Sequence, residues 1–306
     1  MIKENIKPVF KYIGGKSWLR DELRNSIRKC LVNNQLFTYA EPFVGGLGSF
    51  LAIYDILLEH KIKNVILSDI NQTLINTYIY IQNQPKALTN EFLAIEKQFV
   101  HLINSNWRSI HNKTELKDCL RDAEQFFNRV KKEFNINRAN FDITQSARLI
   151  FLQKHSFNGI YRENSKGEYN TPFNWSGHNM LNSIAHKINE MSALFNQFNI
   201  QFIAQSFEEL DYNQNTLYYL DPPYLNDNIT ENKYVKGAFN IEKQLLLIQK
   251  IKNVKFIYSN HKSDILLEEF NKIHNLTVKE LLRKNTISPN SESRKIPKIE
   301  ILVTKI

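Results

Sequence analysis

The stretch EPFVGGLGSF, residues 41–50, decides the fold class that the sequence predicts. It lies between an apolar segment near 37–40, typical of a short strand, and a helical pattern that continues through about residue 58. A second strand-like run, NVILSD at 64–69, is followed by a helical pattern through about residue 81. This order of strand, glycine-rich loop, helix, strand and helix is typical of a doubly wound α/β sheet.

The rest of the chain divides into two kinds of pattern. Between residues 85 and 187 long helical patterns replace the strands, at 88–103 and 114–134. Outside that segment we expect helices at 17–33, 240–252 and 263–272, and strands at 200–204, 217–221, 254–259, 277–282 and 300–305. We therefore expect an α/β domain formed by residues 1–84 and 188–306, interrupted by a helical insertion at 85–187.

The composition favours a nucleic-acid-facing protein. The 306 residues include 40 Lys and Arg against 31 Asp and Glu, a net charge of +9, which suits a polyanionic partner. Two cysteines form no disulfide framework and no zinc pattern, so a reducing cytoplasm is the expected setting, and we expect no metal. Neither a signal peptide nor an apolar run long enough to cross a bilayer is present in the sequence.

The glycine-rich loop suits a ligand that approaches the backbone closely. Gly45, Gly46 and Gly48 leave room for such an approach, and Asp69 ends the next strand about where Rossmann-like sites place a ribose-binding carboxylate. The spacing is not the dinucleotide G-x-G-x-x-G, so a nucleoside cofactor without a pyrophosphate fits better than NAD. A tight turn without any ligand accounts for the loop equally well.

A second glycine stretch, YIGGKS at 12–17, is not a nucleotide phosphate loop. That pattern requires glycine at position 10, which is Phe10, and no strand clearly precedes it. The glycines and Lys16 still suit a small anionic group such as a carboxylate. The alternative is a glycine turn that precedes the helix at 17–33.

The stretch LYYLDPPYLN, 217–226, places a carboxylate, two prolines and an aromatic ring at the end of a strand. Asp221 and the carbonyl of Pro222 provide two acceptors at a fixed separation, which suits an exocyclic amine with its two N–H groups. Tyr224 adds a flat surface for a planar ring, a contact worth about 1–3 kcal/mol per base. Such an arrangement favours attack by the amine of a base on an electrophilic methyl group. The alternative is a proline-rich strand exit with an incidental aspartate.

The chain resembles the Dam-like (D12 class, group α) DNA adenine-N6 methyltransferases, which use S-adenosyl-L-methionine. The resemblance runs from about Pro8 to Ile306, and the order of the motifs agrees with it. The matching motifs are FKYIGGK (X), EPFVGGLGSF (I), LSDIN (II), SFNGIYRENSKGEYNTPF (the hairpin that enters DNA), DPPY (IV), YSNH (VI) and SPNSESRKIPKIEILVTKI (VIII). The resemblance implies a Rossmann-like methyltransferase sheet formed by 1–84 and 188–306, with an inserted helical target-recognition domain at 85–187 that carries a β-hairpin.

The resemblance also implies roles for residues that match the motifs. The catalytic segment is Asp221, Pro222, Pro223 and Tyr224. The residues expected to bind the cofactor are Tyr12, Lys16, Phe43, Gly45, Gly48, Asp69, Ser206, Phe207 and Asp221. Ser206 is a departure, because many relatives carry there a carboxylate that binds the cofactor's adenine amine, and a hydroxyl accepts more weakly. Glu208 is a candidate to compensate.

The hairpin residues implied to bind double-stranded DNA are Phe157, Asn158, Arg162, Asn170 and Pro172. The first two match the part that wedges into DNA when adenine is flipped out, and Arg162 matches an arginine that reads guanine. The alternative for any single member is a structural role in the hairpin. Beyond Phe173 the sequence NWSGHNM departs from the family, so the expected target is GATC or a related guanine-containing site.

Two rival functions remain at this point. One is methylation of cytosine N4 or of RNA, against which the aspartate of DPPY and the hairpin argue. The other is a DNA-binding module that has lost catalysis, against which the intact motifs X, I and IV argue. The family habit implies a restriction-modification role with a cognate restriction endonuclease as partner, and a monomer suffices to read asymmetric duplex DNA.

Overall fold

The computed structural model describes residues 6–10, 17–32, 36–103, 107, 109–175, 184–224, 239–283 and 298–306. The chain divides into two compact units: residues 1–17, 45–51 and 71–204 form the first, and residues 18–44, 52–70 and 205–306 form the second. The predicted insertion at 85–187 falls within the first unit, whose bounds are wider, so the domain boundaries stay a prediction.

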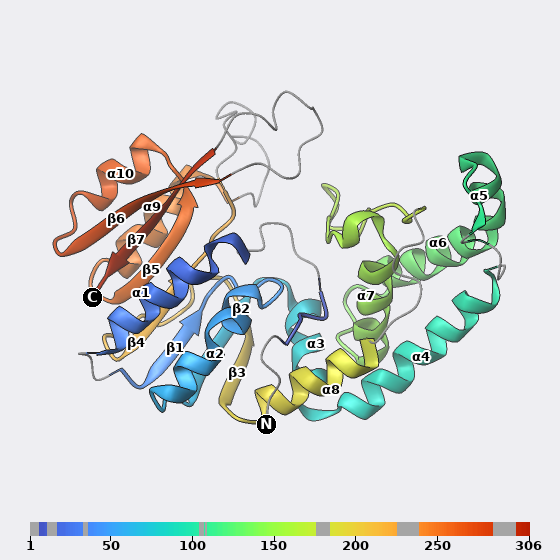
Figure 1. Ribbon diagram of the computed structural model, residues 1–306, viewed down its shortest axis with the longest axis horizontal. Coiled ribbons are helices and arrows are strands. Elements are labelled where there is room, and N and C mark those ends of the chain that lie inside the picture. The colour runs from blue at the N-terminus through green and yellow to red at the C-terminus, as the bar shows by residue number, and fades with distance from the viewer. Residues whose placement is uncertain are drawn as a thin grey trace. The chain divides into compact units, whose positions relative to one another are not determined.

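The second unit contains six strands of a seven-stranded sheet, in the order β2-β1-β4-β5-β7-β6 (Figure 1). β2, β1, β4 and β5 are parallel, and β7 is antiparallel to both β5 and β6. The bounds of the six strands are β1 Thr38–Glu41, β2 Asn64–Asp69, β4 Thr216–Leu220, β5 Lys255–His261, β6 Leu276–Arg283 and β7 Lys298–Lys305. The strands predicted from the sequence are all confirmed, with ends that differ by a residue or two.

Helices α9 and α10 cover one face of this sheet. Leu247 and Ile251 of α9 and Phe270 of α10 belong to the same buried cluster as Tyr218 of β4 and Tyr258 of β5. Helix α1 contacts β5 as well. The helices of this unit are η1 Ser17–Leu19, α1 Arg20–Val32, α2 Gly48–Glu59, α9 Ile241–Ile251 and α10 Asp264–Phe270, of which η1 and α2 begin at residues counted in the first unit. These elements agree with the predicted mixed α/β, Rossmann-like methyltransferase fold.

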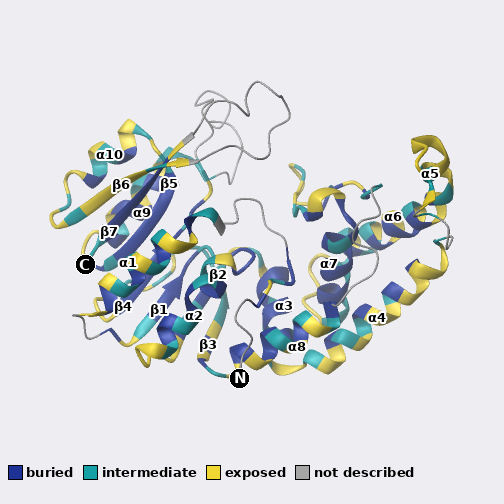
Figure 2. Cartoon of the chain, viewed as in Figure 1, coloured by how far each residue is buried: buried dark blue, intermediate teal, exposed yellow. Residues whose placement is uncertain are grey.

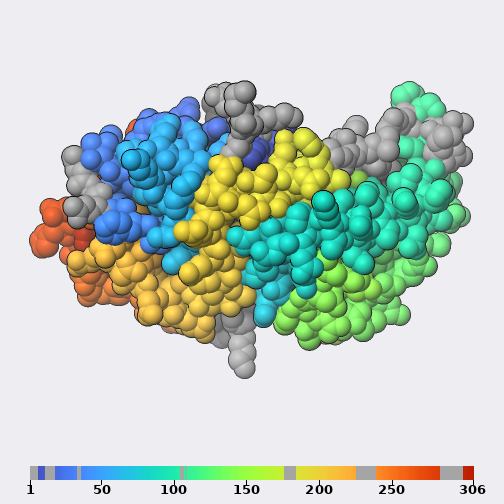
Figure 3. All heavy atoms as spheres, turned by 90° about the horizontal axis from the view of Figure 1, so that it is seen from below, coloured from blue at the N-terminus to red at the C-terminus, as the bar shows by residue number. Residues whose placement is uncertain are grey.

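The first unit is largely helical, and α7 forms its centre. Nine of the thirteen residues of α7 are buried, and α7 contacts α3, α4 and α6. Figure 2 shows most of it in the colour of buried residues. Figure 3 shows α4 and α8 side by side on the surface of the unit, in agreement with their contacts. The elements are α3 Gln72–Asn83, α4 Pro85–His101, α5 Lys113–Cys119, α6 Arg121–Ile136, α7 Ile143–His155, η3 Phe157–Gly159, α8 Ile184–Phe195 and β3 Asn199–Ala204.

In the first unit, one predicted helix is divided into two, and two further helices are present that the sequence patterns did not predict. The single helix expected at 114–134 is two helices, because the chain leaves helical geometry at Leu120 (φ −100°, ψ 6°), whose side chain is buried. Helices α7 and α8 were not predicted. None of the described helices combines the length and the apolar composition that crossing a bilayer requires.

Candidate functional site

The DPPY segment follows directly on β4, whose five residues are all buried. Asp221 and Tyr224 are partly buried, Pro222 is buried and Pro223 is exposed. Since β1, β2, β4 and β5 are parallel, their carboxyl ends lie at one edge of the sheet, where open α/β proteins bind their ligands. Asp221 therefore lies at the edge that also carries Glu41, Asp69 and His261.

A chain of hydroxyl groups leads to the carboxylate of Asp221. The Ser259 hydroxyl of β5 donates to Asp221 Oδ1 at 3.3 Å, and the Tyr219 hydroxyl lies 3.0 Å from Ser259 Oγ. Burial raises the pKa of Tyr219 well above its ordinary value, and the negative charge of Asp221 adds to the effect. Tyr219 therefore stays protonated. Because Ser259 uses its one hydrogen for Asp221, the Tyr219 hydroxyl donates a hydrogen bond to Ser259 Oγ, and both hydroxyl dipoles are oriented toward the carboxylate.

A second chain holds the main chain of the DPPY segment. The Asn260 amide donates to the Tyr258 hydroxyl at 3.1 Å, and that hydroxyl donates to Gln244 Oε1 at 2.7 Å. Gln244, on α9, donates from Nε2 to the carbonyl of Pro223 at 2.9 Å. Gln244 and Asn260 are fully buried, so the chain is shielded from competing water.

Tyr224 is held by an aromatic neighbour and a carboxylate. Its ring centroid lies 4.1 Å from that of His261 at the end of β5, with an interplanar angle of 51°. Its hydroxyl lies 3.4 and 3.5 Å from the two carboxylate oxygens of Glu300 on β7, which is itself buried. All four residues of the YSNH stretch thus support the DPPY segment, directly or through α9.

Phe207 and Phe43 meet in an aromatic cluster together with Phe239. The three ring centroids lie between 5.3 and 5.6 Å apart, and Phe207 exposes only 4% of its surface. The Ser206 hydroxyl accepts a hydrogen bond from the Glu208 N–H at 3.3 Å. The carboxylate of Glu208 forms an ion pair with Lys243 at 3.1 Å, so it serves a contact to α9 in this structure.

The end of β2 is connected by its backbone to the neighbouring loops. The N–H of Val44 donates to the carbonyl of Ser68 at 3.0 Å, and the N–H of Gln205 donates to the carbonyl of Asp69 at 3.1 Å. Asp69 itself is partly exposed at the strand end. These bonds position the Asp69 carboxylate at the same sheet edge as Asp221.

Gly45 and Gly48 both belong to the first unit, but only Gly45 has a backbone conformation that favours glycine. Gly45 has φ 45°, a backbone conformation that favours glycine, and its carbonyl accepts from the Tyr78 hydroxyl at 2.6 Å. Gly48 begins α2, and among the described residues no heavy atom outside its own stretch of helix lies within 4 Å of the position that a Cβ would take there. Tyr12 and Lys16 lie outside the described residues.

The stretch at 156–173 is a hairpin, as predicted. Antiparallel bridges join Ser156 to Phe173 and Glu163 to Tyr169, and Gly167 has φ 72° in the turn. The N–H of Phe157 donates to the carbonyl of Pro172 at 2.8 Å. The first arm of the hairpin is thereby tied to the second.

The hairpin residues expected to contact DNA are at the surface of the first unit. Phe157 exposes 53% of its surface, and Asn158 beside it has φ 57°. Arg162 is exposed, and its Nε donates to Asn170 Oδ1 at 2.7 Å while Nη2 donates to the Asn170 carbonyl at 3.3 Å. Asn170 thus holds the guanidinium of Arg162, a relationship that sequence reasoning missed.

Other supporting residues were also missed by sequence reasoning. They are buried polar residues or ring neighbours that support the DPPY segment or the Phe43–Phe207 pair, directly or, for Tyr258, through Gln244: Phe239, Gln244, Tyr258, Ser259, His261 and Glu300. The YSNH match marked the segment that contains three of them, and the motif VIII match contains Glu300, but Phe239 and Gln244 carry no motif signal.

Comparison with known proteins agrees with these features. The sequence model of the D12 class N6 adenine-specific DNA methyltransferases matches residues 12–288. The Type II methyltransferase M.MjaIII of Methanocaldococcus jannaschii is 27% identical over 97% of this chain and 98% of its own length. The Type II methyltransferase M1.LlaDCHI of Lactococcus lactis subsp. cremoris is 26% identical over 99% and 96%, and the DNA adenine methylase of Escherichia coli strain K12 is 27% identical over 96% and 93%. A strand-end DPPY segment in a Rossmann-like sheet and a match to the family across nearly the whole sequence lead to one conclusion: the chain belongs to the D12 class of N6 adenine-specific DNA methyltransferases.

Proposed function

We propose that this methyltransferase transfers a methyl group from S-adenosyl-L-methionine to the N6 amine of an adenine flipped out of a short, specific sequence in double-stranded DNA. One observation carries the proposal: two hydrogen-bond chains converge on the DPPY segment. Ser259 holds the Asp221 carboxylate, and Gln244 holds the main chain at Pro223. Such bracing is what a preorganised pair of acceptors requires.

In this proposal Asp221 and Pro222 act on the two N–H groups of the adenine amine. The Asp221 carboxylate and the Pro222 carbonyl accept one hydrogen bond each, and they stabilise the positive charge that develops on N6 as the N–C bond forms. Bound S-adenosyl-L-methionine supplies an electrophilic methyl group, whose S–C bond breaks in the same step. S-adenosyl-L-homocysteine is the leaving group, and the proton lost from N6 passes to the solvent. Tyr224 holds the flipped base by stacking.

The residues near the glycine loop fit a nucleoside cofactor. The open space at Gly48, beside the start of a twelve-residue helix, leaves room for a ligand against the backbone. The partly exposed Asp69 carboxylate suits two ribose hydroxyls. We propose that Tyr12, Lys16, Phe43, Gly45, Ser206, Phe207 and Asp221 complete the cofactor contacts that the family resemblance implies.

For DNA, we propose that the hairpin enters the duplex. Phe157 and Asn158 fill the gap left by the flipped adenine, which suits an exposed aromatic ring beside a left-handed residue. Arg162 reads guanine, with Asn170 and Pro172 on the returning arm. The proposed target is GATC or a related site that contains guanine.

The biological role that we propose is modification in a restriction-modification system, with a cognate endonuclease that cleaves the unmethylated site. Two relatives that align over nearly the whole chain are named Type II methyltransferases, which supports this role. We further propose that the protein acts as a monomer, because a single copy carries both the DPPY segment and the hairpin.

The test is to express the protein in a host without adenine methylation and to sequence its DNA for modified bases. N6-methyladenine at one short motif is expected with the wild type and is expected to vanish with Asp221→Ala. Circular dichroism and S-adenosyl-L-methionine titration of the variant should show an intact fold and a bound cofactor. Methylation that persists in the variant would contradict the assignment of Asp221, and N4-methylcytosine or unmodified DNA would contradict the proposed substrate.

A further inference from the structure

A basic pocket lies beside the turn of the recognition hairpin, within the first unit. It is an open hollow of about 470 Å³ lined by the last turns of α6, by Arg138 just beyond them and by Glu168 of the hairpin. Of the charged residues that line it in the described chain, Lys131, Lys132 and Arg138 are cations and Glu168 is the carboxylate. The lining charge is therefore positive, which suits an anion.

The hairpin wall of this pocket is fixed to α6. The side chain of Asn135 pairs with the main chain of Tyr169 in both directions: its Nδ2 donates to the carbonyl at 3.1 Å, and its Oδ1 accepts from the N–H at 2.8 Å. Arg138 donates to the carbonyl of Lys166 in the hairpin turn at 3.0 Å. A ligand in the pocket would therefore contact the helix and the hairpin together.

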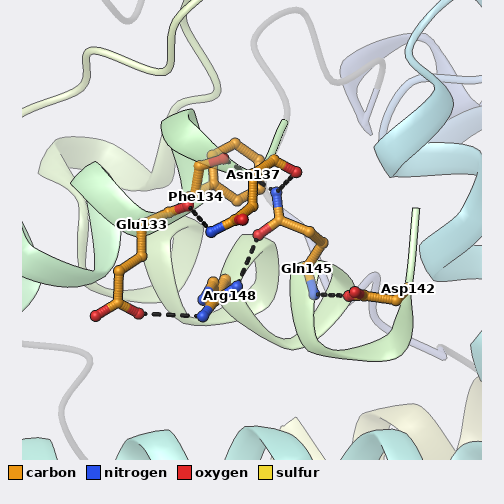
Figure 4. A network of polar contacts seen from close by, with 6 residues as sticks. All are labelled: Glu133, Phe134, Asn137, Asp142, Gln145 and Arg148. Atoms are coloured by element: carbon orange, nitrogen blue, oxygen red, sulfur yellow. Dashed lines mark hydrogen bonds and ion pairs between the residues drawn. The ribbon is translucent and has the colours of Figure 1, made fainter. Parts of the chain in front are cut away.

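The end of α6 is braced from the other side by α7, as Figure 4 shows. Gln145, which is buried, donates from Nε2 to the carbonyls of Phe134 and Asn137, both at 3.0 Å. Arg148 connects Gln145 Oε1 and Glu133 Oε2, at 3.1 Å each. Two carbonyls at the end of α6, those of Phe134 and Asn137, are thus paired with an amide donor, which weakens their repulsion of an anion.

The ammonium group of Lys131 is partly desolvated. Its ammonium lies 5.4 Å from the centre of the Phe127 ring, and burial lowers the pKa of Lys131 below its ordinary value. The carboxylate on the hairpin side, Glu168, already accepts from Asn164 Nδ2 at 2.8 Å. An anion in the pocket would restore the stabilisation that the Lys131 charge loses by burial.

We propose that this pocket binds a backbone phosphate of the duplex next to the recognition hairpin. The occupant is a DNA phosphate because one wall of the pocket belongs to the hairpin that carries Phe157 and Arg162. The inference rests on the proposed function and adds to it a contact that sets the position of the hairpin without reading sequence.

The test compares the salt dependence of DNA binding for three proteins. Binding to a labelled duplex is measured between about 50 and 200 mM NaCl for the wild type, for Lys131→Gln/Lys132→Gln, and for Lys86→Gln/Lys97→Gln. The last variant removes the same charge from exposed positions of α4 in the same unit. In the pocket variant, the slope of log affinity against log salt concentration should be smaller in magnitude by about 0.9, which corresponds to one lost phosphate contact. Its affinity at 0.1 M salt should be roughly fivefold to tenfold weaker than that of the wild type. The α4 variant should stay close to the wild type.

Three outcomes would overturn the inference. If both double variants change the slope equally, the effect is one of net charge and not of the pocket. If inorganic phosphate raises the melting temperature of the wild type but not of the pocket variant, while DNA binding is the same in both, the pocket binds free phosphate. If the wild type binds no duplex at any salt, the proposed function itself fails and the pocket contact fails with it. Melting curves without ligand confirm that both variants are folded.

Discussion

The buried side chain of Gln244 donates a 2.9 Å hydrogen bond to the carbonyl of Pro223 and so connects α9 to the segment after β4. Replacement by leucine removes this bond and the acceptor for Tyr258, with a similar side-chain volume. We expect Gln244→Leu to lower kcat about tenfold, since a misplaced Pro222 carbonyl weakens a transition-state contact worth about 1–1.5 kcal/mol. The KM for S-adenosyl-L-methionine should change little.

The matched control for this prediction is Gln249→Leu on the same helix, where the side chain is exposed. Steady-state kinetics of both variants with a duplex substrate measure the effect. Equal kcat values for the two variants would contradict a positioning role for Gln244.

Two substitutions of Tyr224 separate the contribution of its ring to kcat from the contribution of its hydroxyl. The hydroxyl contacts to Glu300 are long, at 3.4 and 3.5 Å, so Tyr224→Phe should keep kcat within about threefold of the wild type. Tyr224→Ala removes the stacking surface, worth about 1–3 kcal/mol, and should lower kcat about 10- to 100-fold. Fluorescence of 2-aminopurine at the target position reports the flipped base. A loss in Tyr224→Phe as large as in Tyr224→Ala would assign the role to the hydroxyl instead.

The two glycines of the loop should respond differently to alanine. The methyl group of Gly48→Ala meets no heavy atom of the described residues within 4 Å beyond its own stretch of helix. Its melting temperature should therefore match or exceed that of the wild type, whereas its Kd for S-adenosyl-L-methionine should rise. Gly45→Ala places a side chain at φ 45° and should lower stability by about 1 kcal/mol. Calorimetric unfolding and cofactor titration separate the two effects. An unchanged Kd in Gly48→Ala would remove Gly48 from the cofactor contacts.

Asn170 should control how well Arg162 discriminates guanine. Asn170→Ala removes the acceptor at 2.7 Å that orients Arg162 Nε, whereas Asn170→Asp keeps an oxygen there. We expect the alanine variant to lose up to about tenfold in the kcat/KM ratio between the target duplex and one with its guanine replaced. The aspartate variant should keep most of that ratio. If both variants lose it equally, Asn170 contacts DNA itself.

The buried cluster of Glu96, Lys154 and His155 should make stability depend on pH. Glu96 contacts Lys154 and accepts from His155 Nε2 at 2.8 Å, and the His155 ring lies between Phe99 and Phe151. Burial lowers the pKa of His155 below 6.5, although Glu96 opposes the shift. Burial alone would raise the pKa of Glu96, but His155 and Lys154 together bring it below 4.5.

Both shifts have the same consequence for stability. Below about pH 6.5 the unfolded chain binds a proton at His155 that the folded chain resists, so stability falls as the pH falls, and Glu96 adds to the loss below pH 4.5. In His155→Gln the loss between about pH 7.5 and 5.5 should be smaller by about 1 kcal/mol. Denaturant unfolding of both proteins at the two pH values measures this loss in the free energy of unfolding. An identical pH dependence in variant and wild type would mean that His155 titrates normally.

Much of the fold could be predicted because local patterns marked its elements. The strand at 64–69 was predicted with the bounds of β2, since its apolar run ends in a polar residue. Helix α7 was missed because it is buried on nearly all sides, including Gln145, Ser146 and Gln153, and therefore shows no polar face of helical period. The break at Leu120 was missed because a buried leucine continues the apolar pattern across it.

The sequence by itself determined the fold class, the family, and the DPPY and hairpin segments, because each of these depends on residues close together in the chain. Only the tertiary structure decided what holds those segments in place. Ser259 contacts Asp221 from 38 positions away, and Glu300 contacts Tyr224 from 76, because the sheet brings the ends of β4, β5 and β7 together. A contact between distant residues depends on strand order and register, which no local pattern of residues encodes.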